Sequence, residues 1–220
     1  MITPLPCPPE PRTTRDRPST MSSKPPKSPL LLARCAQTAI AAAAILDVFR
    51  AVAVQNRQIH PSAATRHTSG SVSQVFVYLM TLTVVLFLVW LARSRRNALA
   101  LAPQAKLPGG GWLIGAWFVP LLNLFVPRQF VLDIGRASSP SWNPKRDSVL
   151  VNLWWAAWIG HGIALTLTTE AAPGSRAALA VAEALMLAAA GLLCLVIERI
   201  TTLQSAALRT PAPLSPATQA

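Results

Sequence analysis

Three ionisable residues of this chain, Asp47, His161 and Glu183, lie within long apolar segments. An ionisable side chain inside a lipid bilayer costs about 3 kcal/mol even on generous scales, and such residues usually serve function. A histidine and a carboxylate on neighbouring helices could relay protons or bind a cation. We therefore interpret Asp47, His161 and Glu183 as a candidate intramembrane polar cluster.

A purely structural explanation of the same residues stays open. His161 lies between Gly160 and Gly162, where a neutral imidazole could pack between helices, and Glu183 could be protonated or hydrogen-bonded to a neighbouring helix. The sequence has no HExxH or comparable close spacing, so we expect no metal site. We find no catalytic motif or phosphate loop, and we expect neither a cofactor nor an enzymatic activity.

The composition indicates which elements must hold these residues. Hydrophobic residues make up 52% of the 220 and charged residues only 13%, which argues against a soluble protein. Four segments are apolar over about 20 residues, long enough for a helix to cross a hydrocarbon core of about 30 Å. These predicted spans are residues 30–53, 72–92, 149–167 and 177–197.

A further apolar segment, 112–138, is interrupted. The run from Trp112 to Val126 is shorter than the about 20 residues of a span, and Pro120 and Pro127 break helical geometry. After Pro127 the pattern is that of an amphipathic helix, in which only Leu132 is misplaced. Its apolar side would carry Phe130, Val131, Ile134 and Ala137, and its polar side Arg128, Gln129, Asp133 and Arg136. The pattern predicts a re-entrant or interfacial segment at 112–138.

The net charge of +12 agrees with four spans better than with five. With five, the basic residues divide almost evenly between the two sides, whereas with four most of them lie inside, as the positive-inside rule requires. Because no nucleic-acid-binding motif accompanies the charge, we expect no nucleic-acid partner. The predicted cytoplasmic face would meet anionic lipid headgroups. It carries Arg93, Arg95, Arg96, Arg128 and Arg136.

The remaining segments are tails and packing surfaces. Residues 1–29 form a Pro- and Arg-rich tail that we expect to be disordered, as we do 206–220, and translation could start at Met1 or at Met21. Small residues recur every four positions in the last span and in the first, a spacing that permits close helix approach, either within the bundle or between copies. They are Ala180, Ala184 and Ala188, and Ala39 and Ala43.

Residues 89–160 resemble a known family, the bacterial domain of unknown function 4328. The resemblance rests on "VWLARSRRNALAL" at 89–101, "GWLIGAWFVPLLNLFVPRQFVLDIGRASSP" at 111–140 and "LVNLWWAAWIG" at 150–160. Departures are the Pro-rich N-terminus and Gln129, where an aromatic residue would be unsurprising. The residues that match the family motif are Trp117, Phe118, Pro120, Asn123, Pro127, Arg136, Trp154 and Trp155.

The resemblance implies a small multi-pass membrane protein of the bacterial plasma membrane and implies no catalytic residue. We predict an all-α integral membrane bundle of four transmembrane helices within residues 30–205, with both termini cytoplasmic. The expected function is that of a non-enzymatic scaffold or accessory subunit, with a second copy or another membrane protein as its partner. The alternative is a small transporter or channel that uses Asp47, His161 and Glu183.

Overall fold

The computed structural model describes residues 29–115, 119, 122, 124–170 and 175–209. Within these residues, four helices are long and apolar enough to cross a membrane. The described residues contain no strand, so the predicted all-α class with four membrane-length helices is confirmed. The helices are α1 (Leu30–Ile59), α2 (Ala63–Leu101), α3 (Gly110–Gly115), α5 (Val126–Ser138), α6 (Arg146–Glu170) and α7 (Arg176–Arg209).

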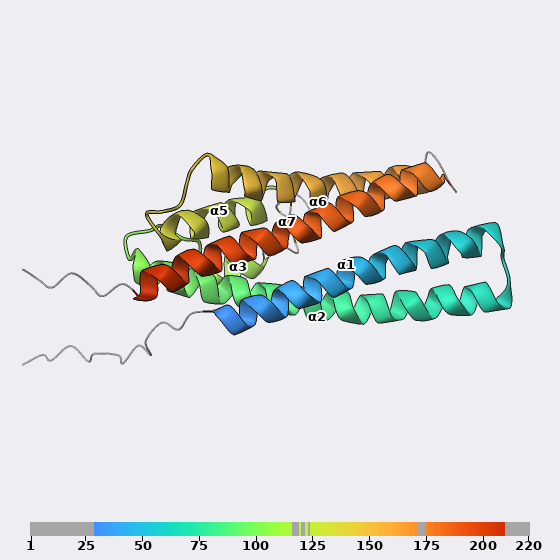
Figure 1. The fold of residues 1–220 in the computed structure, drawn as a ribbon, viewed down its shortest axis with the longest axis horizontal. Coiled ribbons are helices and arrows are strands. Elements are labelled where there is room, and N and C mark those ends of the chain that lie inside the picture. The colour runs from blue at the N-terminus through green and yellow to red at the C-terminus, as the bar shows by residue number, and fades with distance from the viewer. Residues whose placement is uncertain (1–28, 116–118, 120–121, 123, 171–174, 210–220) are drawn as a thin grey trace, which may run out of the picture.

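The four long helices form two hairpins, α1–α2 and α6–α7 (Figure 1). The first hairpin turns at Ser62, which caps α2: its hydroxyl accepts from the Thr65 N–H at 3.1 Å, and the Thr65 hydroxyl accepts from the Ser62 N–H at 2.9 Å. The hairpins join where α1 packs against α7. Figure 1 also shows that α1 begins and α7 ends at the same end of the bundle, where α2 ends. We call this the Arg-rich end, after Arg93, Arg95 and Arg96.

Small residues explain why α1 lies so close to its neighbours. Ala36 and Ala43 are at most 1% exposed and Ala39 is 8% exposed, so this stripe is used inside the bundle. The stripe of Ala180, Ala184 and Ala188 on α7 faces outward instead and is exposed. The small-residue stripe of α1 is therefore buried and that of α7 is exposed, although the two have the same spacing in the sequence.

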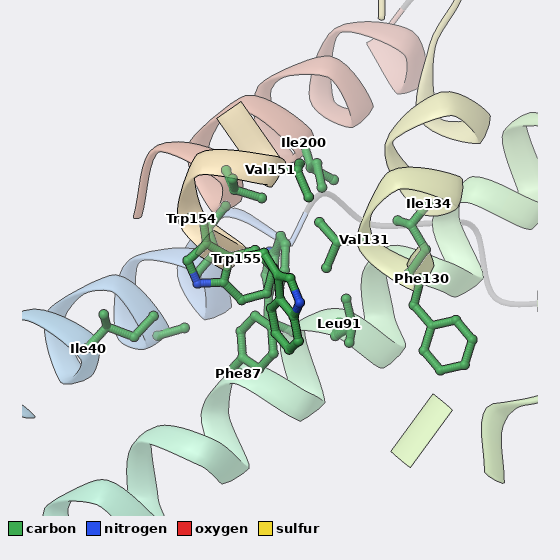
Figure 2. Packing of buried hydrophobic residues seen from close by; sticks show 14 of the residues in the cluster. Ile40, Phe87, Leu91, Phe130, Val131, Ile134, Val151, Trp154, Trp155 and Ile200 are labelled. Carbon is green, nitrogen blue, oxygen red and sulfur yellow. The ribbon is translucent and has the colours of Figure 1, made fainter. Parts of the chain in front are cut away.

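Helix α5 is a wedge at the Arg-rich end that contacts α2, α6 and α7. It is amphipathic, and its apolar side is buried against these helices. The amphipathic pattern placed Leu132 on the polar side, but this residue is only 2% exposed. Because three helices pack against α5, more of its circumference is buried than the pattern predicted. Figure 2 shows Val131 of α5 pointing toward Trp154 and Trp155, whereas the Phe130 ring extends away from them; Phe130 and Ile134 belong to the same buried core.

A buried polar network fixes this wedge. The Gln204 amide of α7 donates to the Ser94 carbonyl of α2 at 2.8 Å and to the Ser138 hydroxyl of α5 at 2.9 Å. Its carbonyl oxygen accepts from Asn97 of α2 at 3.3 Å. Gln204 itself is 0% exposed. One glutamine thus ties three helices together where water cannot compete.

The connection from α5 to α6 is held as tightly. Gly135 permits the Trp142 ring to lie directly on α5, because a Cβ at this position would overlap three ring carbons, the farthest at 2.9 Å. Asp147, near the start of α6, forms an ion pair with Arg199 of α7 at 3.0 Å. Arg199 also donates to the Ser141 carbonyl at 3.2 Å, so the connection is anchored to α7.

Candidate functional site

The structure brings Asp47, His161 and Glu183 together, with Arg50 beside them. Asp47 and Arg50 come from α1, His161 from α6 and Glu183 from α7. The exposed fractions are 1% for Asp47 and 8% each for His161 and Glu183. We call Asp47, Arg50, His161 and Glu183 the charged layer; it lies in the half of the bundle away from the Arg-rich end.

Asp47 points inward because it continues the buried stripe of α1, one turn after Ala43. Arg50 pairs with Asp47 from the next turn: its Nε and one terminal nitrogen each lie 2.6 Å from Oδ1. The guanidinium also lies over the Phe76 ring of α2, 4.7 Å from its centroid, in a cation–π contact. The pair is therefore neutral as a unit and fixed in position.

The orientation of His161 follows from its hydrogen bond. Its Nδ1 lies 2.9 Å from the Ala182 carbonyl oxygen, and since a carbonyl can only accept, Nδ1 carries the hydrogen. The other ring nitrogen, Nε2, lies 4.0 Å from Oδ2 of Asp47, too far for a hydrogen bond. His161 thus presents to a carboxylate a nitrogen that can take up a proton.

Glu183 differs from every other charged residue buried in the described part of the chain. Both of its carboxylate oxygens are buried and neither has a hydrogen-bond partner. The charged groups that act on it are Asp47, His161 and Arg50. Burying a carboxylate without a partner is expensive, so this position is not explained by stability.

A pocket of about 200 Å³ lies on the side of the charged layer away from the Arg-rich end. Glu183 lines it, as does Arg50. The other walls are mixed, with polar groups and apolar side chains in similar number. The polar ones are Gln55, Gln58, Thr168 and Ser175, and the apolar ones Ala51, Val54, Leu165 and Leu179.

A second pocket, of about 140 Å³ and almost wholly apolar, lies on the other side of the charged layer. Three of its lining residues, Ala43, Trp158 and Met186, stand three or four positions from Asp47, His161 and Glu183 respectively. That spacing is one helical turn, about 5.4 Å. The charged layer therefore separates a mixed pocket from an apolar one.

The functional reading of this region rests on the chain itself, because comparisons with curated proteins and with solved structures gave no match. A family model described as "Domain of unknown function (DUF4328)" matches residues 50–202. The chain belongs to the DUF4328 family. The matched residues include Arg50, His161 and Glu183, while Asp47 lies just before them.

The DUF4328 motif residues named from the sequence divide into two groups. Trp117, Phe118, Pro120 and Asn123 lie outside the described residues. The others lie on α5 or on α6: Pro127 of α5 and Trp154 and Trp155 of α6 are buried, and Arg136 of α5 is exposed and pairs with Asp133 at 3.1 Å. The indole of Trp155 donates to the Leu124 carbonyl at 3.0 Å and so fixes the chain just before α5.

The predicted basic face is partly engaged within the protein. The Arg95 guanidinium donates to the Pro108 carbonyl at 2.5 Å, and that of Arg128 to the Asn152 side chain at 2.8 Å. Arg96 is exposed. Arg93 and Arg96 also line a groove between the start of α1 and the end of α2, whose floor includes Leu32 and Leu86.

Sequence reasoning missed the polar residues that line the mixed pocket. Gln58, Thr168 and Ser175 lie at the ends of the predicted spans, where polar residues are the normal boundary with water. Arg50 was recognisable, since it follows Asp47 by the three positions of a helical pair. Among the described residues, no group of three His, Cys, Asp or Glu side chains is placed to hold a metal ion.

Proposed function

We propose that this DUF4328 protein is a small, non-enzymatic transporter or channel whose ions or solutes meet Glu183. One observation carries the proposal. Glu183 is only 8% exposed, neither of its carboxylate oxygens has a hydrogen-bond partner, and a pocket lies beside it. A carboxylate kept in a membrane protein at this cost marks a pathway for ions or protons more often than a structural contact.

The charges of the layer support this reading. Asp47 and Arg50 neutralise each other, so the net charge is set by Glu183 and His161. Uptake or release of one proton by these two groups changes that charge by one unit, and a bound cation does the same. Because Glu183 already lines the mixed pocket and the apolar pocket adjoins the layer on its other side, small movements of α6 or α7 would bring Glu183 to the apolar pocket as well.

Proton flux into vesicles tests the proposal. The purified protein is reconstituted into liposomes that contain a pH-sensitive dye, and a pH jump is applied with potassium and valinomycin to clamp the voltage. We expect faster equilibration than in empty liposomes, and a rate close to that of empty liposomes with Glu183→Gln. Glu198→Gln, on the same helix but in the Arg34 ion pair at 2.8 Å, is the matched control and should retain the flux. Equal rates for wild type and Glu183→Gln would refute the proposal.

An interaction role, as scaffold or accessory subunit, is the second candidate. It is supported by the exposed stripe of Ala180, Ala184 and Ala188, which continues at the exposed Gly191 and which none of the described helices covers. Such a surface suits close approach of a second helix. Cysteine cross-linking in native membranes tests it: Ala184→Cys should form a dimer or a heterologous adduct, whereas Val85→Cys on α2 should not. Absence of adducts at Ala184 removes this candidate.

We further propose that the protein lies in a bacterial plasma membrane with the Arg-rich end and both termini in the cytoplasm, where anionic headgroups would bind Arg93 and Arg96. The segment between α2 and α6 would then be re-entrant. Trp155 is nine residues into α6, about 13 Å along the helix, and it holds Leu124 at this depth. Ser141→Cys, at an exposed position just after α5, should accordingly be inaccessible to an impermeant thiol reagent added outside intact cells and become labelled once the cells are opened, and labelling in intact cells would refute this topology.

A further inference from the structure

The mixed pocket beside Glu183 has walls of two kinds, and this defines what it can hold. Leu165 and Leu179 form an apolar wall, whereas Gln58, Thr168 and Ser175 supply hydroxyl and amide groups. Its volume of about 200 Å³ greatly exceeds the about 15 Å³ that one water molecule requires on the same measure. The pocket is therefore suited to a small organic molecule with both polar and apolar parts.

The charge of the pocket selects among such molecules. Of its two charged lining groups, Arg50 already pairs with Asp47 at 2.6 Å and stacks on Phe76. Glu183 has both oxygens free of partners and only accepts hydrogen bonds when ionised; the two oxygens are buried behind the pocket wall, so a ligand would reach them after a rotation of the side chain. The unpartnered carboxylate of Glu183 would therefore pair best with a positively charged hydrogen-bond donor, because charge-assisted hydrogen bonds are the strongest that a carboxylate accepts.

We propose that this pocket binds a small primary organic ammonium ion, whose –NH₃⁺ group donates to Glu183 while its short alkyl chain lies against Leu165 and Leu179. This inference rests on the proposed function and names the substrate class of the same site. A bound monocation cancels the negative charge of ionised Glu183, so the charged layer becomes neutral as a whole. An anion would instead meet an unpaired carboxylate.

Inorganic cations fit these walls less well. Na⁺ and K⁺ need several oxygen ligands at short range, whereas the apolar side chains Ala51, Val54, Leu165 and Leu179 occupy a large share of this lining. A neutral alcohol would fill the same volume but leave the carboxylate without a charged partner. Both are useful comparisons, since each removes one part of the proposed recognition.

Binding is measured on the full-length protein in detergent by isothermal titration, with butylammonium, 1-butanol and butyrate as probes of equal chain length and different charge. We expect butylammonium to bind and the other two to bind at least about tenfold more weakly, as the loss of one charge-assisted hydrogen bond implies. Equal binding of 1-butanol, or displacement of butylammonium by equimolar NaCl, would overturn the proposal.

Two variants assign the binding to this pocket. Glu183→Gln should weaken butylammonium binding about tenfold or more, while Glu198→Gln, a carboxylate on the same helix at the Arg-rich end, should not change it. Leu179→Trp fills the pocket but leaves the carboxylate in the sequence, and it should also abolish binding. Thermal unfolding of each variant without ligand establishes that it is folded. Unchanged affinity in Glu183→Gln or in Leu179→Trp overturns the assignment.

The outcomes separate this inference from the transporter proposal. If proton flux depends on Glu183 but butylammonium does not bind, the ligand class is wrong and the transporter proposal survives. If butylammonium binds through Glu183 but neither protons nor butylammonium enter the liposomes, the pocket is a binding site and the transporter proposal falls.

Discussion

At the Arg-rich end, Gln204 satisfies buried groups of α2 and α5, and Asp147 is paired with Arg199; in the opposite half, Glu183 is buried with no partner. Two groups at the Arg-rich end also lack a partner, the Ser94 hydroxyl and the Trp142 indole N–H, but both are neutral. The comparison indicates that the buried polar groups of the Arg-rich end stabilise the fold, whereas the buried charge of Glu183 in the opposite half does not. Substitutions at the two ends should therefore differ in their cost.

The largest effect is expected from Gln204→Ala at the Arg-rich end. It leaves Asn97, the Ser94 carbonyl and the Ser138 hydroxyl with one partner fewer, at a cost of about 1–3 kcal/mol for each group left unsatisfied. We expect the free energy of unfolding to fall by about 2–4 kcal/mol, measured by circular dichroism during titration of detergent micelles with sodium dodecyl sulfate. Gln58→Ala, at an exposed position, should cost less than about 0.5 kcal/mol. Similar losses in both variants would contradict the structural role of Gln204.

Gly135→Ala tests the packing of the same end. The added methyl group would overlap the Trp142 ring, and overpacking of this kind costs about 1–3 kcal/mol. The same titration measures it. Gly162→Ala in α6 is the matched control: a Cβ there meets nothing within 4 Å, and helix propensity favours alanine, so its stability should be unchanged or higher. A tolerated Gly135→Ala would show that α5 and Trp142 are not held closely.

A smaller loss is expected within the charged layer from Asp47→Asn. The substitution removes the partner of Arg50, whose side chain is 25% exposed, so the cost is reduced by solvent to about 1–2 kcal/mol. Asp133→Asn, in the more exposed Arg136 pair, should cost less than about 0.5 kcal/mol. Equal costs for the two aspartates would mean that the Asp47 pair is no better sheltered than a surface pair.

The smallest effect on stability is expected from Glu183→Gln, although this variant should have the largest effect on flux. No hydrogen bond is lost, and an unpartnered buried charge is removed, so stability should stay within about 0.5 kcal/mol of wild type or rise. Chemical denaturation of wild type and variant in parallel measures it. A loss above about 1 kcal/mol would place Glu183 with the structural groups of the Arg-rich end and remove the contrast between the two ends.

The sequence predicted the four long helices because their signal is local: an apolar run of sufficient length needs no knowledge of its neighbours. It also named Asp47, His161 and Glu183, because ionisable residues within such runs are rare. Helix orientation was not predictable, since Ala39 and Ala43 face the interior and Ala180, Ala184 and Ala188 face outward with the same spacing.

The environment of α5 was equally beyond the sequence. The spacing of its apolar residues indicated one apolar side. Leu132 is nevertheless buried, because α5 contacts three helices. The number of neighbouring helices cannot be predicted from the spacing of apolar residues in one helix. The partners of Gln204 lie on three separate segments, so only the fold could reveal that one polar residue joins them. The mixed pocket was hidden for a similar reason, as its polar residues lie at the ends of three different helices.

Helix α2 has 39 residues, which at 1.5 Å per residue is about 58 Å, nearly twice the thickness of a hydrocarbon core of about 30 Å. The α1–α2 hairpin projects beyond the described part of the α6–α7 hairpin (Figure 1), so its tip is a two-helix rod closed by the Ser62 cap. A rod anchored in the bundle acts as a lever arm. Because α1 packs along α2, a displacement of the tip would be transmitted along α1 toward Asp47 and Arg50 of the charged layer.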